Sequence, residues 1–332
     1  MTQKKIAIIG AGLSGSYLAS TLSKAGCDVA VFEKSRGSGG RMSSSRLSDG
    51  AADLGCPYLE PLSPIFTHWL EQQPNTERWE ARLTHHVEGT GEVFNPWVAN
   101  PRMSALTRHL LADAHLNTQV RISSVWPDKE GVLLRDEEGH SIDHFDAVII
   151  TAPTPQAANL LEAIPRFEHK AEELMPNPRF VALLGLSKPV DTNAQVLLNS
   201  DNGACLRRAI LDSAKPGHQS GGFSQIWQLE THEDWAKEHV DVPTDQIANR
   251  MIESFERWLG QSIEVAHFRC HRWLYATHPS VNPTPYLWSE TDGIGVVGDW
   301  LTCEETPKET TAAERAWLSA HALASHLISQ WK

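Results

Sequence analysis

Cysteine is scarce in this sequence and never occurs in a C-x-x-C pair. The chain of 332 residues has five cysteines, at positions 27, 56, 205, 270 and 303. An odd and scattered set of this kind excludes a secreted disulfide scaffold. Long apolar runs are missing as well, because no stretch approaches the ~18 consecutive apolar residues that a membrane-spanning helix needs. We therefore expect no membrane partner.

Basic charge is also in deficit, with 29 lysines and arginines against 41 acidic residues and a net charge of −12. Because this charge repels phosphate backbones, nucleic acid is not an expected partner. Hydrophobic residues make up 41% of the chain and charged residues 21%, which excludes disorder as the dominant state. The length suits two domains, or one large domain with an insertion.

A short apolar run, residues 6–9, follows two lysines near the start of the chain. It stops at Gly10, whereas the apolar region of a signal peptide needs about 7–15 residues. A fully apolar run bounded by glycine is typical of a buried parallel strand. We expect a cytoplasmic protein in which this run is the first strand.

A complete G-x-G-x-x-G motif follows at once. Gly10 suits the tight turn, Gly12 lets backbone N–H groups approach a pyrophosphate, and Gly15 lets a helix pack closely on the strand. The order of predicted elements is strand, glycine turn, helix (16–25) and strand (28–32). This context favours dinucleotide binding over the alternative of a plain glycine-containing turn.

Two features around this motif define the expected contacts. Leu13 and Ser14 lie within the motif just before the predicted helix, whose positive dipole end faces the phosphates. Glu33 stands 18 residues after the last glycine of the motif, where an acid accepts hydrogen bonds from ribose hydroxyls. Because an acid disfavours a 2′-phosphate, NADP is a poor candidate for this site.

A second glycine-rich loop decides which dinucleotide is expected. It ends in Gly39-Gly40-Arg41-Met42 and is followed by a D-x-G motif at Asp53-Leu54-Gly55. This arrangement resembles the flavin-containing amine oxidase superfamily. The resemblance implies an FAD cofactor, whose pyrophosphate meets the arginine and whose flavin ring lies beside the residues after D-x-G. The contacts implied for this part of the chain are Lys34, Gly40, Arg41, Met42, Gly55, Cys56 and Pro57.

Later segments extend the resemblance. Residues 120–125 lie where the family contacts adenine, which implies a contact at Ile122. Residues 293–300 form a predicted strand that ends in Gly298 and Asp299, and the family's aspartate accepts a hydrogen bond from the ribityl chain. The alternative is a plain buried strand. The following helix, with Ala316 and Trp317, would aim its N-terminus at the flavin and stabilise negative charge there.

The predicted fold class is α/β, with a Rossmann-like FAD-binding domain and an inserted substrate domain of antiparallel sheet plus helix. We expect helices at 104–114 and 245–259, and substrate-domain strands at 180–184 and 225–229. The predicted FAD-binding domain comprises residues 1–75, 100–155 and 277–332. The predicted substrate domain comprises residues 76–99 and 156–276.

Several motifs resemble the bacterial renalases within this superfamily. They are found at residues 34–44, 103–108, 271–276, 298–300 and 316–319. The resemblance implies an FAD-dependent oxidase that returns 2- or 6-dihydro isomers of NAD(P) to NAD(P)+, with O2 as electron acceptor. The sequence departs from renalases at Cys56-Pro57 and at two arginines, Arg102 and Arg315, which replace glycines.

The flavin would carry the redox chemistry, so no catalytic side chain is assigned. Pocket candidates are Tyr58, His271, Trp273 and Tyr275, and either His271 or Arg272 would contact a phosphate or carboxamide. The alternative role for Trp273 is core packing, and His271 is expected to be structural. No metal is expected, and the partner is a small-molecule substrate. The oligomeric state stays open, as do two other functions: a flavin enzyme for amines or other reduced substrates, and a non-catalytic FAD-binding protein.

Overall fold

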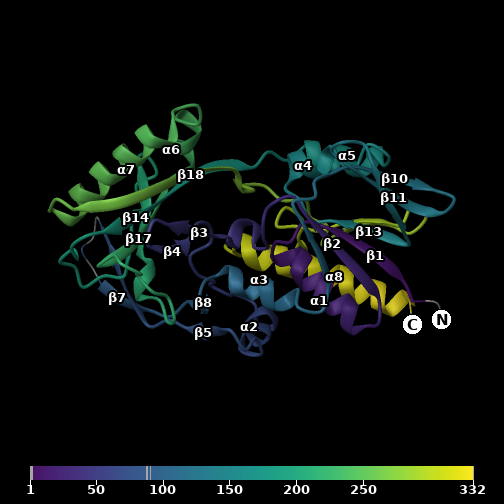
Figure 1. The fold of residues 1–332 in the computed structure, drawn as a ribbon, viewed down its shortest axis with the longest axis horizontal. Helices are drawn as coiled ribbons and strands as arrows, with labels where there is room; N and C mark the ends of the chain where they lie inside the picture. Colours follow the sequence, from purple (N-terminus) through teal and green to yellow (C-terminus); the bar gives the residue numbers. More distant parts are fainter. Residues whose placement is uncertain (1–2, 87–88, 90, 332) are drawn as a thin grey trace.

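The computed structural model describes residues 3–86, 89 and 91–331, and the chain forms two lobes (Figure 1). One lobe is built on a six-stranded sheet and the other on a seven-stranded sheet. The chain passes between the lobes more than once, so each sheet combines strands that are distant in sequence.

The six-stranded sheet has the order β19-β20-β13-β1-β2-β9, and all its neighbouring strands are parallel except the pair β19 and β20. The predicted first strand is confirmed as β1, whose successive side chains enter two different hydrophobic clusters on opposite faces of the sheet. The strands are β1 (Lys5–Ile9), β2 (Asp28–Glu33), β9 (His115–Thr118), β13 (Ala147–Ile150), β19 (Leu287–Ser289) and β20 (Ile294–Val296).

Both faces of this sheet are covered. On one face, the first cluster joins Ile6 and Ile8 to the helices α1 (Leu13–Lys24), α3 (Ser104–Leu110) and α8 (Ala312–Trp331). On the other face, Ala7 and Ile9 meet two short helices and a three-stranded sheet. These elements are α4 (Thr154–Ala158), α5 (Pro165–Glu172), β10 (Ile122–Asp128), β11 (Gly131–Asp136) and β12 (Ser141–Phe145).

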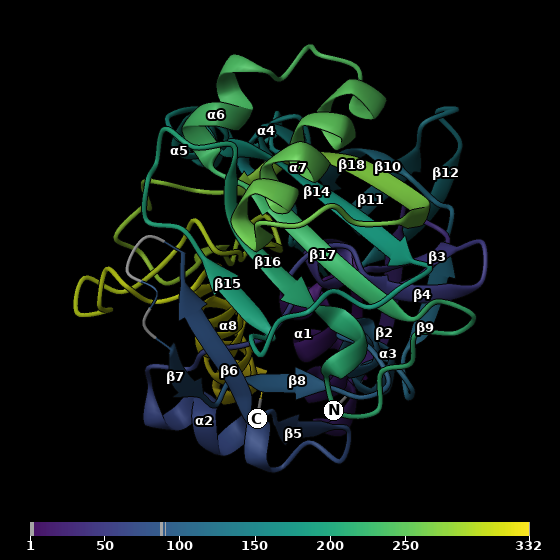
Figure 2. The same cartoon turned by 90° about the vertical axis from the view of Figure 1, so that its left-hand side faces the viewer.

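The second sheet has the order β18-β14-β17-β16-β15-β6-β7, with only the β15–β6 pair parallel. Two helices, α6 (Glu233–Glu238) and α7 (Thr244–Leu259), cover its outer face (Figure 2). The predicted helix at 245–259 is confirmed as α7, which ends at Gly260 with φ of 64°. The strands are β6 (Ala81–His85), β7 (Gly91–Phe94), β14 (Asn177–Leu186), β15 (Val196–Leu198), β16 (Leu206–Leu211), β17 (Gln225–Thr231) and β18 (Val265–Thr277).

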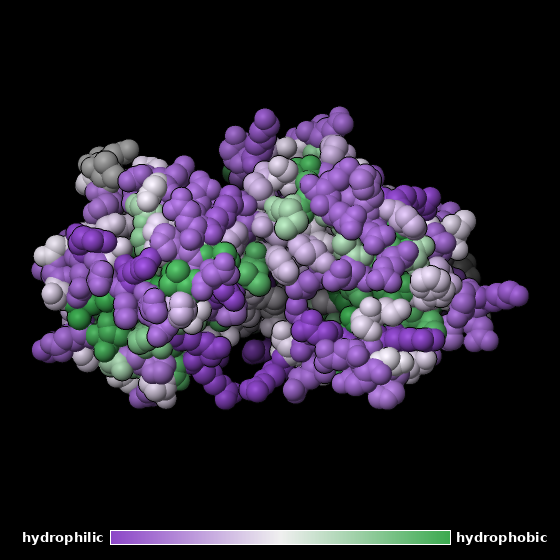
Figure 3. Space-filling view, turned by 90° about the horizontal axis from the view of Figure 1, so that it is seen from above, coloured by the Kyte–Doolittle hydropathy of each residue, from purple (hydrophilic) through white to green (hydrophobic). Residues whose placement is uncertain are grey.

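The inner face of the second sheet packs on a hairpin of β3 (Ser44–Leu47) and β4 (Gly50–Asp53). Leu47, Ala52 and Leu54 share a cluster with Val181 and Leu183 of β14. The hairpin therefore brings the D-x-G motif to the junction of the lobes. Seen from above, the surface is recessed between the two lobes (Figure 3). The remaining elements are α2 (Pro64–Glu71), β5 (Thr76–Arg78), β8 (Trp97–Ala99) and the short helices at Gly40–Met42 and Asp212–Ala214.

Two predicted elements are shorter than expected. The helix expected over 104–114 ends at Leu110, and the chain soon enters β9. This edge strand is mostly exposed and polar, so no apolar periodicity marks it in the sequence. The strand expected over 293–300 is confined to β20, because Gly298 and Asp299 lie in the turn that follows. None of the helices within the described ranges is long and apolar enough to cross a membrane.

Candidate functional site

The glycine motif forms a tight turn between β1 and α1. Gly10 has φ of 107°, and a Cβ atom there would lie 2.5 Å from Thr151 Oγ1. A Cβ atom at Gly15 would lie 2.0 Å from the carbonyl oxygen of Gly10, so only glycine fits. Gly12 is the N-cap of α1 and supplies no side-chain cap, and the first turn carries no acid. The N–H groups at this helix start are therefore suited to an anion.

The second glycine loop packs directly on the first. A Cβ atom at Gly40 would lie 3.2 Å from the Cα atom of Gly12, and Gly39 donates its N–H to the Ala11 carbonyl (2.8 Å). The adjacent Arg41 thereby lies close to the start of α1. The two loops form a backbone cradle that larger residues would fill, next to one cationic side chain, which is the donor set that a diphosphate requires.

Glu33 fixes the other end of this cradle. Its buried carboxylate accepts hydrogen bonds from the Ala11 N–H (2.9 Å) and the Ser35 N–H (2.8 Å). Each carboxylate oxygen can accept a second bond, so both remain suitable for ribose hydroxyls. Ile122 shares a buried cluster with Phe32, the residue before Glu33. Lys34 instead donates to Gln156 (2.9 Å), and burial lowers its pKa.

Arg41 and Asp299 form a two-point ion pair, with N–O distances of 2.8 and 2.6 Å. His278 Nδ1 lies 3.0 Å from the same carboxylate, and all three groups meet at the end of β20. Burial alone would raise the pKa of Asp299, but the charges and hydrogen bonds of Arg41 and His278 hold it well below its ordinary value. Asp299 therefore stays ionised.

The residues at the end of the D-x-G motif and just after it contact the backbone of Arg41. A Cβ atom at Gly55 would lie 1.9 Å from the Arg41 carbonyl oxygen, which also accepts the Cys56 N–H (2.7 Å). The Cys56 thiol donates to the Tyr58 carbonyl (3.0 Å), and burial raises its pKa to about 11. Pro57 is buried beside it. We call residues 55–58 the junction segment.

Three strands of the second sheet contact the junction segment or the residue before it. Gln228 on β17 donates to the Gly55 carbonyl (2.7 Å), and Trp273 on β18 donates to the Leu54 carbonyl (2.9 Å). Arg208 on β16 donates to the Tyr58 hydroxyl (3.2 Å) and lies over the Tyr58 ring. The sheet thus fixes this segment through side chains rather than through its own backbone.

The other pocket candidates lie on β18. His271 packs edge-to-face on Trp273, with ring centroids 4.5 Å apart, and burial lowers the pKa of His271. Tyr275 is half-buried two residues further along. Arg272, the alternative to His271 as a contact for a phosphate or carboxamide, donates instead to the Val240 carbonyl next to α6. Alternate residues of a strand point to opposite faces, and Arg272 points away from the junction segment.

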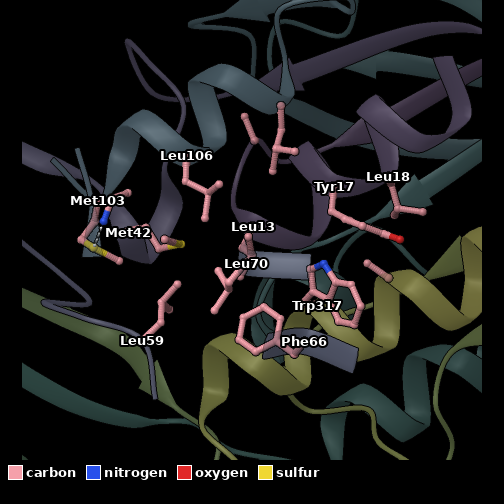
Figure 4. Close-up of a cluster of buried hydrophobic side chains, with 14 of the residues drawn as sticks. Leu13, Tyr17, Leu18, Met42, Leu59, Phe66, Leu70, Met103, Leu106 and Trp317 are labelled. Atoms are coloured by element: carbon pink, nitrogen blue, oxygen red, sulfur yellow. Dashed lines mark hydrogen bonds between the residues drawn. The ribbon is translucent and has the colours of Figure 1, made fainter. Parts of the chain in front are cut away.

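Some predicted cofactor contacts have their side chains in the core instead. Leu13, Met42 and Trp317 belong to the cluster between α1, α2 and α8 (Figure 4). Trp317 packs against Tyr17 and Phe66, with ring centroids 5.1 and 5.3 Å away. Only the backbones of these residues remain suited to a cofactor. Nearby, Ala316 accepts a hydrogen bond from Ser14 (2.8 Å), and the Gly298 N–H donates to Ser319 (3.1 Å).

The two arginines that depart from the renalase pattern have different surroundings. Arg315 donates to the carbonyl oxygens of Asp299 (2.9 Å), Thr310 (2.7 Å) and His278 (3.4 Å). It therefore braces the turn that carries Asp299. Arg102 is half-buried and makes no side-chain hydrogen bond within the described residues.

Sequence reasoning missed an arginine cluster beside Tyr58. Arg179, Arg207 and Arg208 all donate to Glu230 on β17, and Arg179 also donates to Glu233. Burial alone would raise the pKa of Glu230, but the three arginines hold it at about 2. The adjacent arginines at 207 and 208, within the otherwise apolar segment 206–211, are the signal that could have revealed this cluster.

A second buried ionic group was also missed. Lys215 donates to Asp53 (2.8 Å) and Asp212 (2.5 Å), and His218 Nδ1 lies 3.2 Å from Asp212. The ligand atoms of the two aspartates and the histidine lie close enough to hold a metal ion. The Lys215 ammonium already supplies the positive charge there. This group ties the D-x-G aspartate to the second lobe.

The fold and the glycine cradle define a two-lobed, dinucleotide-binding α/β protein. Residues 8–72 match the family described as an NAD(P)-binding Rossmann-like domain, and residues 78–293 match flavin containing amine oxidoreductase. The second match covers more than half of the chain, so the protein belongs to the flavin-containing amine oxidoreductase family. It is an FAD-dependent oxidoreductase.

Solved structures show the same fold at low sequence identity. An oxidoreductase from Methanosarcina mazei has a TM-score of 0.72 and 15% identity, over 97% of this chain and 100% of its own. A triple mutant of putrescine oxidase has a TM-score of 0.73 and 11% identity, over 99% of both chains. A fatty acid isomerase from P. acnes has a TM-score of 0.67 and 12% identity, over 97% of this chain and 98% of its own. Such different activities on one fold leave the substrate to be argued from the site.

Proposed function

We propose that this oxidoreductase oxidises 2- or 6-dihydro isomers of NAD(P) to NAD(P)+, as the renalase-like motifs imply. Bound FAD would supply the hydride acceptor and would pass the electrons to O2. The protein's own part is to bind the two nucleotides, hold the junction segment in place and exclude water.

The observation that carries this proposal is the net positive charge of the cluster beside Tyr58, where three arginines face the carboxylates of Glu230 and Glu233. An amine substrate arrives as an ammonium ion at neutral pH and would be repelled by this net positive charge. A dihydronicotinamide dinucleotide carries negative phosphates and is attracted by the same charge. The site thus favours an anionic substrate over an amine.

The groups around the junction segment also suit a reaction without a base. A dihydropyridine loses hydride with help from its own ring nitrogen and becomes aromatic, so no side chain needs to take a proton. Cys56 stays a neutral thiol because burial raises its pKa to about 11. Gln228 and Trp273 are held by hydrogen bonds to the backbone and carry no charge.

In this proposal the FAD diphosphate lies at the start of α1 and Arg41, its ribose at Glu33 and its ribityl chain at Asp299. We also propose the domain division stated above, with residues 76–99 and 156–276 as the substrate domain. A cytoplasmic location, which the scattered cysteines favour, belongs to the same proposal.

Anaerobic mixing of the purified FAD enzyme with reduced donors tests the function. We expect prompt bleaching of the flavin by 2- or 6-dihydro-NAD(P) and no bleaching by amines. Bleaching by amines alone would assign the protein to amine oxidation. If no donor of either class bleaches the flavin, the chain holds FAD without turnover and the proposal is wrong.

A further inference from the structure

Arg207 owes its position to an irregularity in β16. Leu206 pairs with Thr231 and Arg208 pairs with Glu230, so Arg207 is an extra residue in this strand. In a regular strand, two successive side chains point to opposite faces. A β-bulge re-aims one of them. Here Arg207 and Arg208 both reach the carboxylate of Glu230.

The carboxylates of Glu230 and Glu233 do not balance the charge of the arginine cluster described above. Glu230 accepts from Arg208 through one oxygen and from Arg179 through the other, and Glu233 also pairs with Arg179. Arg207 reaches only the Glu230 oxygen that Arg179 already contacts, at a distance of 3.3 Å. Glu60 is the other acid nearby, and within the described residues it makes no ion pair with Arg207. One of the three positive charges therefore lacks a close counter-charge of its own.

Arg207 is also the accessible member of the cluster. Its side chain is 42% exposed, against 11% for Arg179 and 13% for Arg208. The charge of Arg208, together with burial, lowers the pKa of Arg207. An anion bound at Arg207 would relieve this repulsion between like charges.

We propose that Arg207, supported by Arg208, forms an anion subsite that binds a phosphate group of the substrate. The subsite adjoins the junction segment through the Arg208–Tyr58 contact. It rests on the proposed function in one respect, the identity of the molecule that carries the phosphate. A guanidinium with free N–H groups is suited to phosphate, which it contacts at two oxygens.

The first test compares two donors that differ only in phosphate: 6-dihydronicotinamide mononucleotide and its riboside. In the FAD enzyme, Arg207→Gln should raise the apparent Kd for the mononucleotide roughly 10–100-fold in anaerobic flavin reduction. The riboside should be unaffected, and the limiting rate should change little. Arg207→Lys keeps the charge but loses the two-oxygen contact, so its Kd should lie between those of wild type and Arg207→Gln. Arg250→Gln, an exposed arginine on α7, is the matched control. Equal affinity of wild type and Arg207→Gln for the mononucleotide would overturn the subsite.

A second measurement does not depend on turnover. Inorganic pyrophosphate is titrated into the oxidised FAD enzyme while tryptophan fluorescence is followed. Binding to wild type and Arg250→Gln, but not to Arg207→Gln, supports the subsite even if no dihydronicotinamide reduces the flavin, in which case only the proposed function fails. Reduction by dihydronicotinamides without any pyrophosphate binding overturns the subsite and leaves the function standing. If Arg207→Gln does not fold, the salt dependence of pyrophosphate binding to wild type decides, and binding that is unaffected by salt overturns the subsite.

Discussion

Arg41 and Asp299 lie 258 positions apart in the chain and bind each other through two hydrogen bonds. The pair joins the second glycine loop to the turn after β20. His278 and Arg315 hold the same turn, through the carboxylate and the backbone of Asp299 respectively. The two residues that were expected at the diphosphate and at the ribityl chain are therefore parts of one ionic group.

Substitution Asp299→Asn should weaken FAD binding. An amide keeps the shape of the side chain but leaves the charge of Arg41 without a buried counter-ion. We expect the Kd for FAD, measured by flavin fluorescence on adding FAD to the apoprotein, to rise roughly 10–100-fold. Asp143→Asn, at an exposed ion pair with Lys5, should leave it unchanged. An unaltered Kd in Asp299→Asn would show that the ion pair lies outside the cofactor site.

Glu230 should make the stability of the protein depend on acid pH. Its pKa is about 2 in the folded chain against an ordinary 4.5, because three arginines outweigh its burial. A lowered pKa means that the stabilisation is complete above pH 4.5 and is lost as the pH falls toward 2. The difference corresponds to about 3 kcal/mol of unfolding free energy. Urea unfolding at several pH values gives the free energy of unfolding as a function of pH. Over this range the free energy should change less steeply with pH in Glu230→Gln than in wild type, and an identical dependence would contradict the prediction.

The order of elements in the first lobe could be predicted because each has a local signal. The apolar run of β1, the glycine motif and the acid at position 33 are adjacent in sequence and fold as a unit. The helix α7 was predicted for the same reason, since its apolar stripe and its terminal glycine are local. Strand β9 has no such signal, because its pairing with β2 depends on backbone hydrogen bonds at a polar edge.

The second-lobe side of the site could not be predicted, because its signals are non-local. Arg179, Arg208 and Glu230 come from three strands, and only sheet register brings them together. Lys215 looks like an ordinary surface lysine in the sequence, yet it is buried with Asp53, far away in the chain. For Trp317 the motif indicated a cofactor contact, but the sequence could not show that its ring fills the core and leaves only its backbone for such a contact.

The cysteines should differ sharply in reactivity. Burial raises the pKa of Cys56 to about 11, so almost none of it is thiolate at neutral pH, whereas Cys303 is exposed. Iodoacetamide at pH 7.5 should alkylate Cys303 and spare Cys56 in the folded enzyme, and peptide mass spectrometry reads both sites. Unfolding in urea is the control, after which both should react. Fast labelling of Cys56 in the folded enzyme would mean that the junction segment is open to solvent.

Lys215→Met should be among the most destabilising single substitutions in the chain. Methionine fills a similar volume, but it leaves Asp53 and Asp212 as neighbouring buried carboxylates without the ammonium that neutralises them. Removing one partner of a buried ion pair typically costs about 3–5 kcal/mol of unfolding free energy. Urea unfolding measures the loss, and Lys237→Met, at an exposed pair with Asp234, should cost less than about 1 kcal/mol. Combining Lys215→Met with Asp53→Asn and Asp212→Asn removes the stranded charges and should recover part of the stability. If the triple variant is less stable than Lys215→Met alone, hydrogen bonding by the two aspartates, rather than charge neutralisation by the lysine, holds the hairpin against the second lobe.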